Sequence, residues 1–192
     1  MIGEKLGHVL DKPLKPLAQR IPLTPNALSV IGFLITLCGS YVLTYNLRIG
    51  GIFIVVGSCF DMLDGIVARV NNRSTIFGAY LDSVFDRYAD AFILLAIAWN
   101  LGQHNSHGGV LLCLGTLIGS FLISYARARA EGLGVDCKHG LMERPERIIL
   151  IAIGTITGFI LPVLWILLIL THMTVIQRVH YVWRQTIKDG QE

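Results

Sequence analysis

Apolar residues occur along this chain in long blocks, separated by short stretches that contain polar residues, glycine or proline. A block of about 20 apolar residues has the length that an α-helix needs to cross the hydrocarbon core of a membrane. We therefore predict an all-α membrane protein with six transmembrane helices. The predicted helices cover residues 27–46, 50–70, 77–100, 108–130, 147–160 and 162–182. The fifth is short and nearly abuts the sixth, so their boundaries are the least sharply defined.

The composition supports a membrane protein and argues against a soluble domain. The 192 residues are 53% hydrophobic and 15% charged, and the mean hydropathy is +0.61. Soluble domains carry about 25% charged residues. Since no basic patch interleaved with aromatic residues lies outside the apolar blocks, we expect no nucleic-acid partner.

The first 20 residues have no apolar core with a cleavage site, so they do not form a cleaved signal peptide. Apolar residues recur there at helical spacing with lysines among them, which predicts an amphipathic juxtamembrane helix in the headgroup plane. A frayed cytoplasmic tail is the alternative. We thus expect an interfacial segment over residues 1–20 and a transmembrane domain over residues 21–188.

Basic residues are distributed unevenly between the two sides of the predicted bundle. Of the 16 lysines and arginines, all but Arg48 and Arg87 lie before the first helix, after the last, or in the second and fourth connections and the helix ends beside them. Positively charged connections stay in the cytoplasm. We therefore predict cytoplasmic termini and a basic face that suits anionic lipid headgroups.

Five of the thirteen acidic residues lie within residues 61–90, inside or at the edge of two apolar blocks. An ionised carboxylate at the centre of a membrane helix costs about 2.5–3.5 kcal/mol on insertion scales. Positive charge must therefore balance this group. Asp90 and Arg87 are spaced to form an internal ion pair, with contact to a metal ligand as the alternative for this pair.

The other four carboxylates are spaced to meet. Asp61 and Asp64 share one face of the second predicted helix, and Asp82 and Asp86 share one face of the third. In an antiparallel hairpin, Asp61 lies level with Asp86 and Asp64 with Asp82. Four converging carboxylates suit Mg²⁺ or Mn²⁺, and such a site can hold two ions.

Small residues accompany both acidic pairs. Gly65 and Ala68 follow the first pair, and Gly78 and Ala79 precede the second. They would let the two helices approach each other, or let a nucleotide approach the backbone. Close packing of the helices alone is the simpler explanation for Gly78 and Ala79.

This segment has the pattern D-x2-D-G-x2-A-R-x8-G-x3-D-x3-D, in which eight fixed positions span 26 residues. It resembles the signature of the CDP-alcohol phosphotransferase family, with every fixed position and spacing intact. The resemblance implies a homodimeric membrane enzyme that attacks the β-phosphorus of a CDP-alcohol and releases CMP. It also implies metal ligation by Asp61, Asp64, Asp82 and Asp86, with Asp86 as general base. Gly65, Ala68, Arg69 and Gly78, together with Asp61, would form the nucleotide site.

The connection between the fourth and fifth predicted helices is rich in arginine. Its pieces S-Y-A-R-A-R-A-E and E-R-P-E-R resemble the branch of the family that uses inositol phosphate to make phosphatidylinositol phosphate or archaetidylinositol phosphate. Arginine offers a fork of donors for a phosphate, whereas the positive-inside bias alone would also place arginines here. The candidates for binding the acceptor phosphate are Ser124, Arg127, Arg144 and Arg184.

Other functions stay open at this point. The same chemistry could serve glycerol 3-phosphate, serine or another alcohol, and the donor could be CDP-diacylglycerol, CDP-archaeol or a water-soluble CDP-alcohol. A cation transporter would also place aspartates inside a membrane. Such a transporter would hold them near the midplane with access from both sides, whereas this cluster lies nearer the cytoplasmic edge.

Overall fold

The structure is a computed structural model that describes residues 15–16, 18, 20–137, 139–188 and 190. Within this part of the chain there is no strand, and the predicted all-α fold with six helices is confirmed. The helices are α2 (Pro25–Leu43), α3 (Leu47–Val70), α4 (Ile76–Gln103), α5 (His107–Gly132), α6 (Arg144–Thr157) and α7 (Ile160–Lys188). The interfacial helix predicted over residues 1–20 falls largely outside the described residues.

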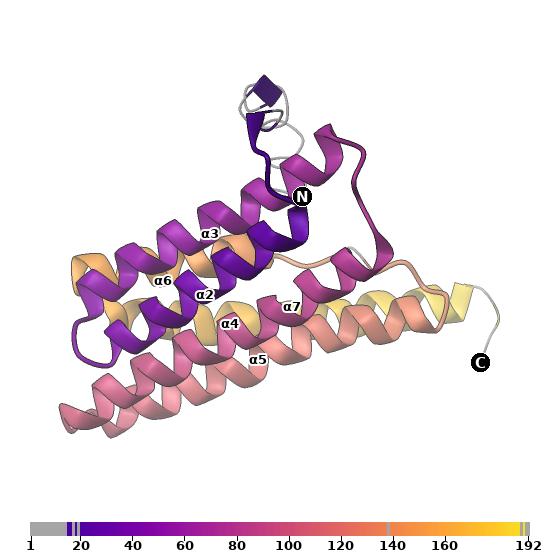
Figure 1. The fold of residues 1–192 in the computed structure, drawn as a ribbon. Coiled ribbons are helices and arrows are strands. Elements are labelled where there is room, and N and C mark those ends of the chain that lie inside the picture. Colours follow the sequence, from indigo (N-terminus) through magenta and orange to yellow (C-terminus); the bar gives the residue numbers. More distant parts are fainter. Residues whose placement is uncertain (1–14, 17, 19, 138, 189, 191–192) are drawn as a thin grey trace.

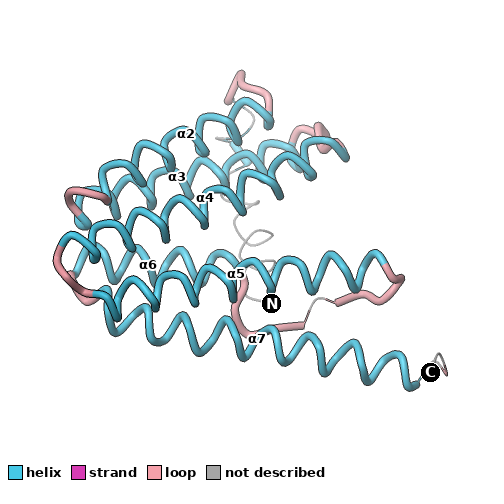
Figure 2. Tube along the Cα trace, turned by 90° about the horizontal axis from the view of Figure 1, so that it is seen from below, coloured by secondary structure: helices cyan, strands magenta, loops and turns pink. Residues whose placement is uncertain are grey.

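The six helices form two groups of three, which Figure 2 shows one above the other. In the first group α2 packs against both α3 and α4, and in the second α7 packs against both α5 and α6. Contacts of α4 with α5 and of α3 with α6 join the groups. Turns of two or three residues join α2 to α3, α4 to α5 and α6 to α7 at one end of the bundle. At the opposite end, here called the site end, α2 begins and α3 finishes (Figure 1).

Four helices are long and apolar enough to cross a membrane: α2, α3, α5 and residues Ile160–Ile187 of α7. Helix α4 has sufficient length, but it carries four charged residues between positions 82 and 90, namely Asp82, Asp86, Arg87 and Asp90. Helix α6 has 14 residues, or about 21 Å, which is less than the hydrocarbon thickness of about 30 Å. Large apolar side chains cover the outside of the bundle, among them Leu34, Leu111 and Trp165. These features describe an integral membrane protein.

Small residues let α2 and α3 approach closely. Gly32, Thr36 and Gly39 are buried on α2 and meet Gly57 and its neighbours on α3. A methyl group added at Gly57 would lie 3.1 Å from the carbonyl oxygen of Gly32 and 3.3 Å from the backbone nitrogen of Thr36, and it would also meet Thr36 Oγ1. Because most of these atoms belong to the backbone, they cannot rotate away. Glycine is therefore required at this helix crossing.

The substitution Gly57→Ala should destabilise the protein by about 1–3 kcal/mol, the usual cost of overpacking a buried contact. The matched control is Gly108→Ala in α5, where an added methyl group would meet nothing within 4 Å. Thermal unfolding in detergent measures both variants. Equal midpoints for the two would contradict the close α2–α3 contact.

Candidate active site

Three carboxylates meet at the site end of the bundle. Asp61 and Asp64 of α3 and Asp82 of α4 each offer an oxygen atom, and these oxygens all lie within 4.8 Å of one another. We call these residues the acidic triad. The i, i+3 spacing of the first two directs both side chains from one face of α3, and α4 supplies the third from across the site. For these three residues the predicted convergence is found.

Asp64 is the most buried residue of the triad, with 6% of its surface exposed. Ser29 of α2 holds it, since the Ser29 hydroxyl donates a hydrogen bond to Asp64 Oδ2. Sequence reasoning missed Ser29, because a serine within an apolar block does not reveal which neighbouring helix it will contact. The bond fixes the position of the carboxylate beside the other two acids.

The triad suits a hard divalent cation. Its donor set consists of oxygen only, and these oxygens are closely spaced. Such a set selects magnesium, manganese or calcium over softer metals. The chain can therefore hold a divalent ion between α3 and α4.

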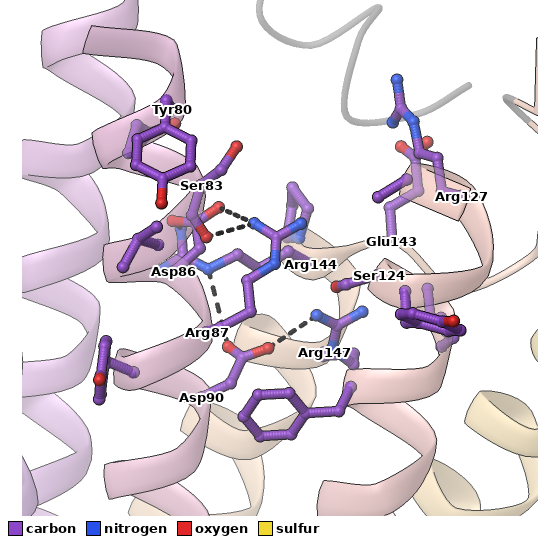
Figure 3. A pocket seen from close by; sticks show the side chains of 18 of the residues that line it. Tyr80, Ser83, Asp86, Arg87, Asp90, Ser124, Arg127, Glu143, Arg144 and Arg147 are labelled. Atoms are coloured by element: carbon purple, nitrogen blue, oxygen red, sulfur yellow. Dashed lines mark hydrogen bonds and ion pairs between the residues drawn. The ribbon is translucent and has the colours of Figure 1, made fainter. Parts of the chain in front are cut away.

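Asp86 joins the triad through an arginine. Arg144 Nη1 contacts Asp61 Oδ2 and lies 2.6 Å from Asp86 Oδ1, so one guanidinium bridges the first and fourth predicted ligands. The same arginine reaches toward Asp90, with 3.6 Å between its Nε and Asp90 Oδ1. Figure 3 shows Arg144 between the carboxylates of α4.

The predicted ion pair between Arg87 and Asp90 is wrong. Asp90 Oδ2 instead accepts a hydrogen bond of 2.7 Å from Arg147 Nη2 on α6. Arg87 Nη1 donates to the carbonyl of Ser83 at 2.7 Å and lies 3.5 Å from Asp86 Oδ2. Arg87 thus has the alternative role, contact with a predicted metal ligand. The cation for Asp90 therefore comes from another helix, because Arg147 of α6 reaches its carboxylate.

Arg144 and Arg147 both lie in the first turn of α6. Glu143 and Glu146 form a capping box, in which Glu146 Oε2 accepts a hydrogen bond of 3.1 Å from the backbone N–H of Glu143. The preceding loop descends along α7, since the N–H of Leu141 donates to Gln177 Oε1 and that of Met142 to Thr174 Oγ1, both at 3.1 Å. Helix α6 therefore begins inside the bundle, at the level of the acids (Figure 1).

A large cavity of about 1240 Å³ opens beside these groups, between α4, α5 and α6. Three of the four predicted acceptor residues line it, namely Ser124, Arg127 and Arg144. Arg127 Nε lies 2.8 Å from Glu131 Oε1 on the same helix. Arg184 does not line this cavity; it lines a separate one of about 490 Å³ with His139, Gln177 and Tyr181. The structure thus separates Arg184 from the other three.

The predicted nucleotide residues lie along the site end of α3 and the first turn of α4. Gly65 and Ala68 are half-buried, Arg69 is exposed, and Arg69 also lines the large cavity. A methyl group at Gly65 would meet only the Arg69 side chain, whereas one at Gly78 would lie 2.8 Å from Asn26 Oδ1 of α2. Gly78 therefore allows α4 to approach α2, and the expected close approach of α3 and α4 at this glycine is wrong.

Two further arginines of the site were predicted only as part of the basic face. Arg147 and Arg178 both line the large cavity, and they are 4% and 3% exposed. Arg178 donates to the carbonyl of His139 at 2.8 Å and to that of Ile123 at 2.5 Å. The spacing of Arg147 three residues after Arg144 was a usable signal for a shared helix face. No such signal in the sequence marks Arg178, because its partners are backbone carbonyls.

Comparison with known proteins agrees with this geometry. The family model for CDP-alcohol phosphatidyltransferase matches residues 22–183. Archaetidylinositol phosphate synthases of Pyrococcus horikoshii and Methanothermobacter thermautotrophicus are 40% and 36% identical over 184 residues. The match covers 93% of both chains for the first and 92% of both chains for the second.

Solved structures agree as well. The crystal structure of Mycobacterium tuberculosis phosphatidylinositol phosphate synthase with CDP-DAG bound has a TM-score of 0.81 and 30% sequence identity. That match covers 90% of this chain and 93% of the other. A structure of the same mycobacterial enzyme in complex with manganese and citrate gives a TM-score of 0.78.

Replacing a triad carboxylate by its amide should weaken Mn²⁺ binding strongly. We expect Asp64→Asn and Asp82→Asn each to lower the affinity by at least the roughly 10–100-fold that loss of an outer partner of a metal ligand costs. Calorimetric titration of the purified protein with Mn²⁺ measures this. The control is Glu131→Gln, which removes a carboxylate of the large cavity outside the triad. Wild-type affinity in both aspartate variants would rule out the triad as the metal site.

Proposed function

This chain belongs to the CDP-alcohol phosphatidyltransferase family, and from that premise we propose that it transfers a phosphatidyl-type group from a CDP-linked lipid to a small phosphorylated alcohol, with release of CMP. The observation that carries this proposal is the placement of the acidic triad beside a cavity lined with arginines. The triad suits the metal-bound diphosphate of a donor, and the cavity suits an anionic acceptor. CDP-diacylglycerol and CDP-archaeol present the same diphosphate, so both fit as donors.

Asp61, Asp64 and Asp82 would hold the divalent metal, which we propose to be two ions of Mg²⁺ or Mn²⁺ with Asp86 as the fourth ligand. When bound, such ions polarise the diphosphate and neutralise the charge that develops on the leaving CMP. Gly65 and Ala68 leave room for the nucleotide along α3. Arg69, Gly78 and Asp61 complete the proposed nucleotide site.

Asp86 is the proposed general base. Its side chain is 16% exposed and lines the large cavity one helical turn from Asp82. An acceptor hydroxyl in the cavity can therefore donate its proton to a carboxylate next to the donor site, which is the geometry that general-base catalysis needs. Arg144 Nη1 lies 2.6 Å from Asp86 Oδ1, so the proposed base is next to a proposed ligand of the acceptor.

Inositol phosphate is the proposed acceptor. Ser124, Arg127 and Arg144 line the same cavity, and the two guanidinium groups supply charged donors for a phosphate. The similarity to two archaetidylinositol phosphate synthases supports this choice. Arg184 is the weakest member of the predicted set, because it lines the smaller cavity.

We also propose an orientation and an assembly. The basic residues at the site end support an orientation with both termini and the active site on the cytoplasmic side, and the organisms of the relatives support a prokaryotic cell membrane. A homodimer is proposed on the family resemblance. Exposed apolar side chains on the outer faces of the helices suit lipid contact and helix–helix contact alike.

The acceptor assignment is tested with a panel of alcohols. Purified wild-type protein, supplied with a CDP-linked lipid and Mg²⁺ or Mn²⁺, should release CMP with inositol phosphate, and EDTA should abolish this release. Inositol, glycerol 3-phosphate and serine complete the panel. Turnover with free inositol but not with its phosphate would contradict the acceptor assignment, and undiminished turnover in EDTA would contradict the metal site.

Two substitutions separate the roles of base and acceptor ligand. Asp86→Asn should lower kcat by about 10²–10⁴-fold, the usual contribution of a general base. Arg127→Gln should chiefly raise the KM for inositol phosphate, because it removes a charged donor and leaves the acidic groups in place. Steady-state kinetics of CMP release measure both effects, and a main effect of Arg127→Gln on the KM for the CDP-lipid would refute its assigned role.

A further inference from the structure

Two ion pairs span the large cavity between α4 and α6. Arg144 pairs with Asp86 at 2.6 Å, and one turn deeper Arg147 pairs with Asp90 at 2.7 Å. The pairs repeat because the arginines lie three residues apart on α6 and the aspartates lie four apart on α4. Figure 3 shows the deeper pair below the upper one.

The deeper pair lies outside the family signature and outside the roles proposed so far. Asp90 and Arg147 are 6% and 4% exposed, so they are more buried than Asp86 and Arg144. Asp90 uses its oxygens differently: Oδ2 accepts from Arg147, and Oδ1 faces Arg144 Nε at 3.6 Å. Asp90 is thus the one carboxylate that joins both arginines of α6 among the residues described.

We propose that Asp90, held by Arg147, is a positioning residue that sets the direction of the Arg144 guanidinium and thereby the affinity for the acceptor phosphate. This inference rests on the proposed function, in which Arg144 contacts that phosphate. Arg144 lies between Asp61 and Asp86 on one side and Asp90 on the other. The electrostatic attraction of Asp90 keeps the Arg144 guanidinium from moving fully toward Asp61 and Asp86.

The arrangement of charges gives the reason. Without the Asp90 charge, the ion-pair partners left to Arg144 are Asp61 and Asp86, and Arg147 loses the carboxylate that it binds. Leaving one member of a buried pair uncompensated is strongly unfavourable. Arg144 would then shift toward Asp61 and Asp86, and away from the position in which it contacts the acceptor phosphate.

The substitution Asp90→Asn keeps the shape of the side chain and removes its charge. It should raise the KM for inositol phosphate by about tenfold, the loss expected when one charged hydrogen bond is misplaced. The KM for the CDP-lipid should rise less than the KM for inositol phosphate, because Asp90 acts on the triad only through Arg144 among the contacts described. A change in KM with kcat little altered marks the loss of uniform binding.

The double variant Asp90→Asn/Arg147→Gln separates positioning from stability. It leaves no unpaired buried charge, so its thermal midpoint should recover relative to Asp90→Asn, while its KM for inositol phosphate should stay raised. Leu164 lies on α7 and packs in the hydrophobic core. The control Leu164→Ala should lower the thermal midpoint without changing this KM.

The outcomes are distinct. Recovery of both the midpoint and the acceptor KM in the double variant would show a purely structural pair and overturn the proposal, as would a wild-type KM in Asp90→Asn. If the single variant does not fold, the KM of the double variant decides the question alone. Absence of CMP release from the wild-type protein with any acceptor would instead contradict the proposed function, and the positioning role would fall with it.

Discussion

Concentrated negative charge in an apolar bundle is the constraint on which the rest of this structure depends. Five aspartates lie on α3 and α4 within segments whose outer surfaces are apolar, and three of them meet closely enough to share one cation. Ionised carboxylates in such surroundings have a high free energy unless a positive charge lies near them. Two arginines of a third helix, α6, supply this positive charge. The site depends on α6 because its first turn lies at the same level as the aspartates.

Several local features of the sequence serve this arrangement. The capping box of Glu143 and Glu146 fixes where α6 begins, and the bonds of Leu141 and Met142 to α7 fix how deep it begins. Glycines on α2 and α3 allow the close packing that brings Ser29 to Asp64. Each feature acts on the backbone, and together they place side chains from four helices around one site.

Much of this could be predicted from the sequence, because helical periodicity and hydrophobic block length are local properties. The six helices, the shared faces of the aspartate pairs and the convergence of Asp61, Asp64 and Asp82 all follow from spacing. What could not be predicted depends on which helices become neighbours. Asp90 pairs with Arg147 of α6 rather than with Arg87 of its own helix, Gly78 meets α2 rather than α3, and Arg184 faces a different cavity from Arg127.

The shortness of α6 has a consequence for how two very different substrates can meet. A helix of 14 residues that starts at the level of the acids leaves a recess in the protein, the large cavity, which residues of the longer helices α5 and α7 also line. A water-soluble sugar phosphate can descend into such a recess from the aqueous side. A lipid anchored by its tails can approach from the bilayer and stay in it, so neither molecule has to leave its own solvent before the two react.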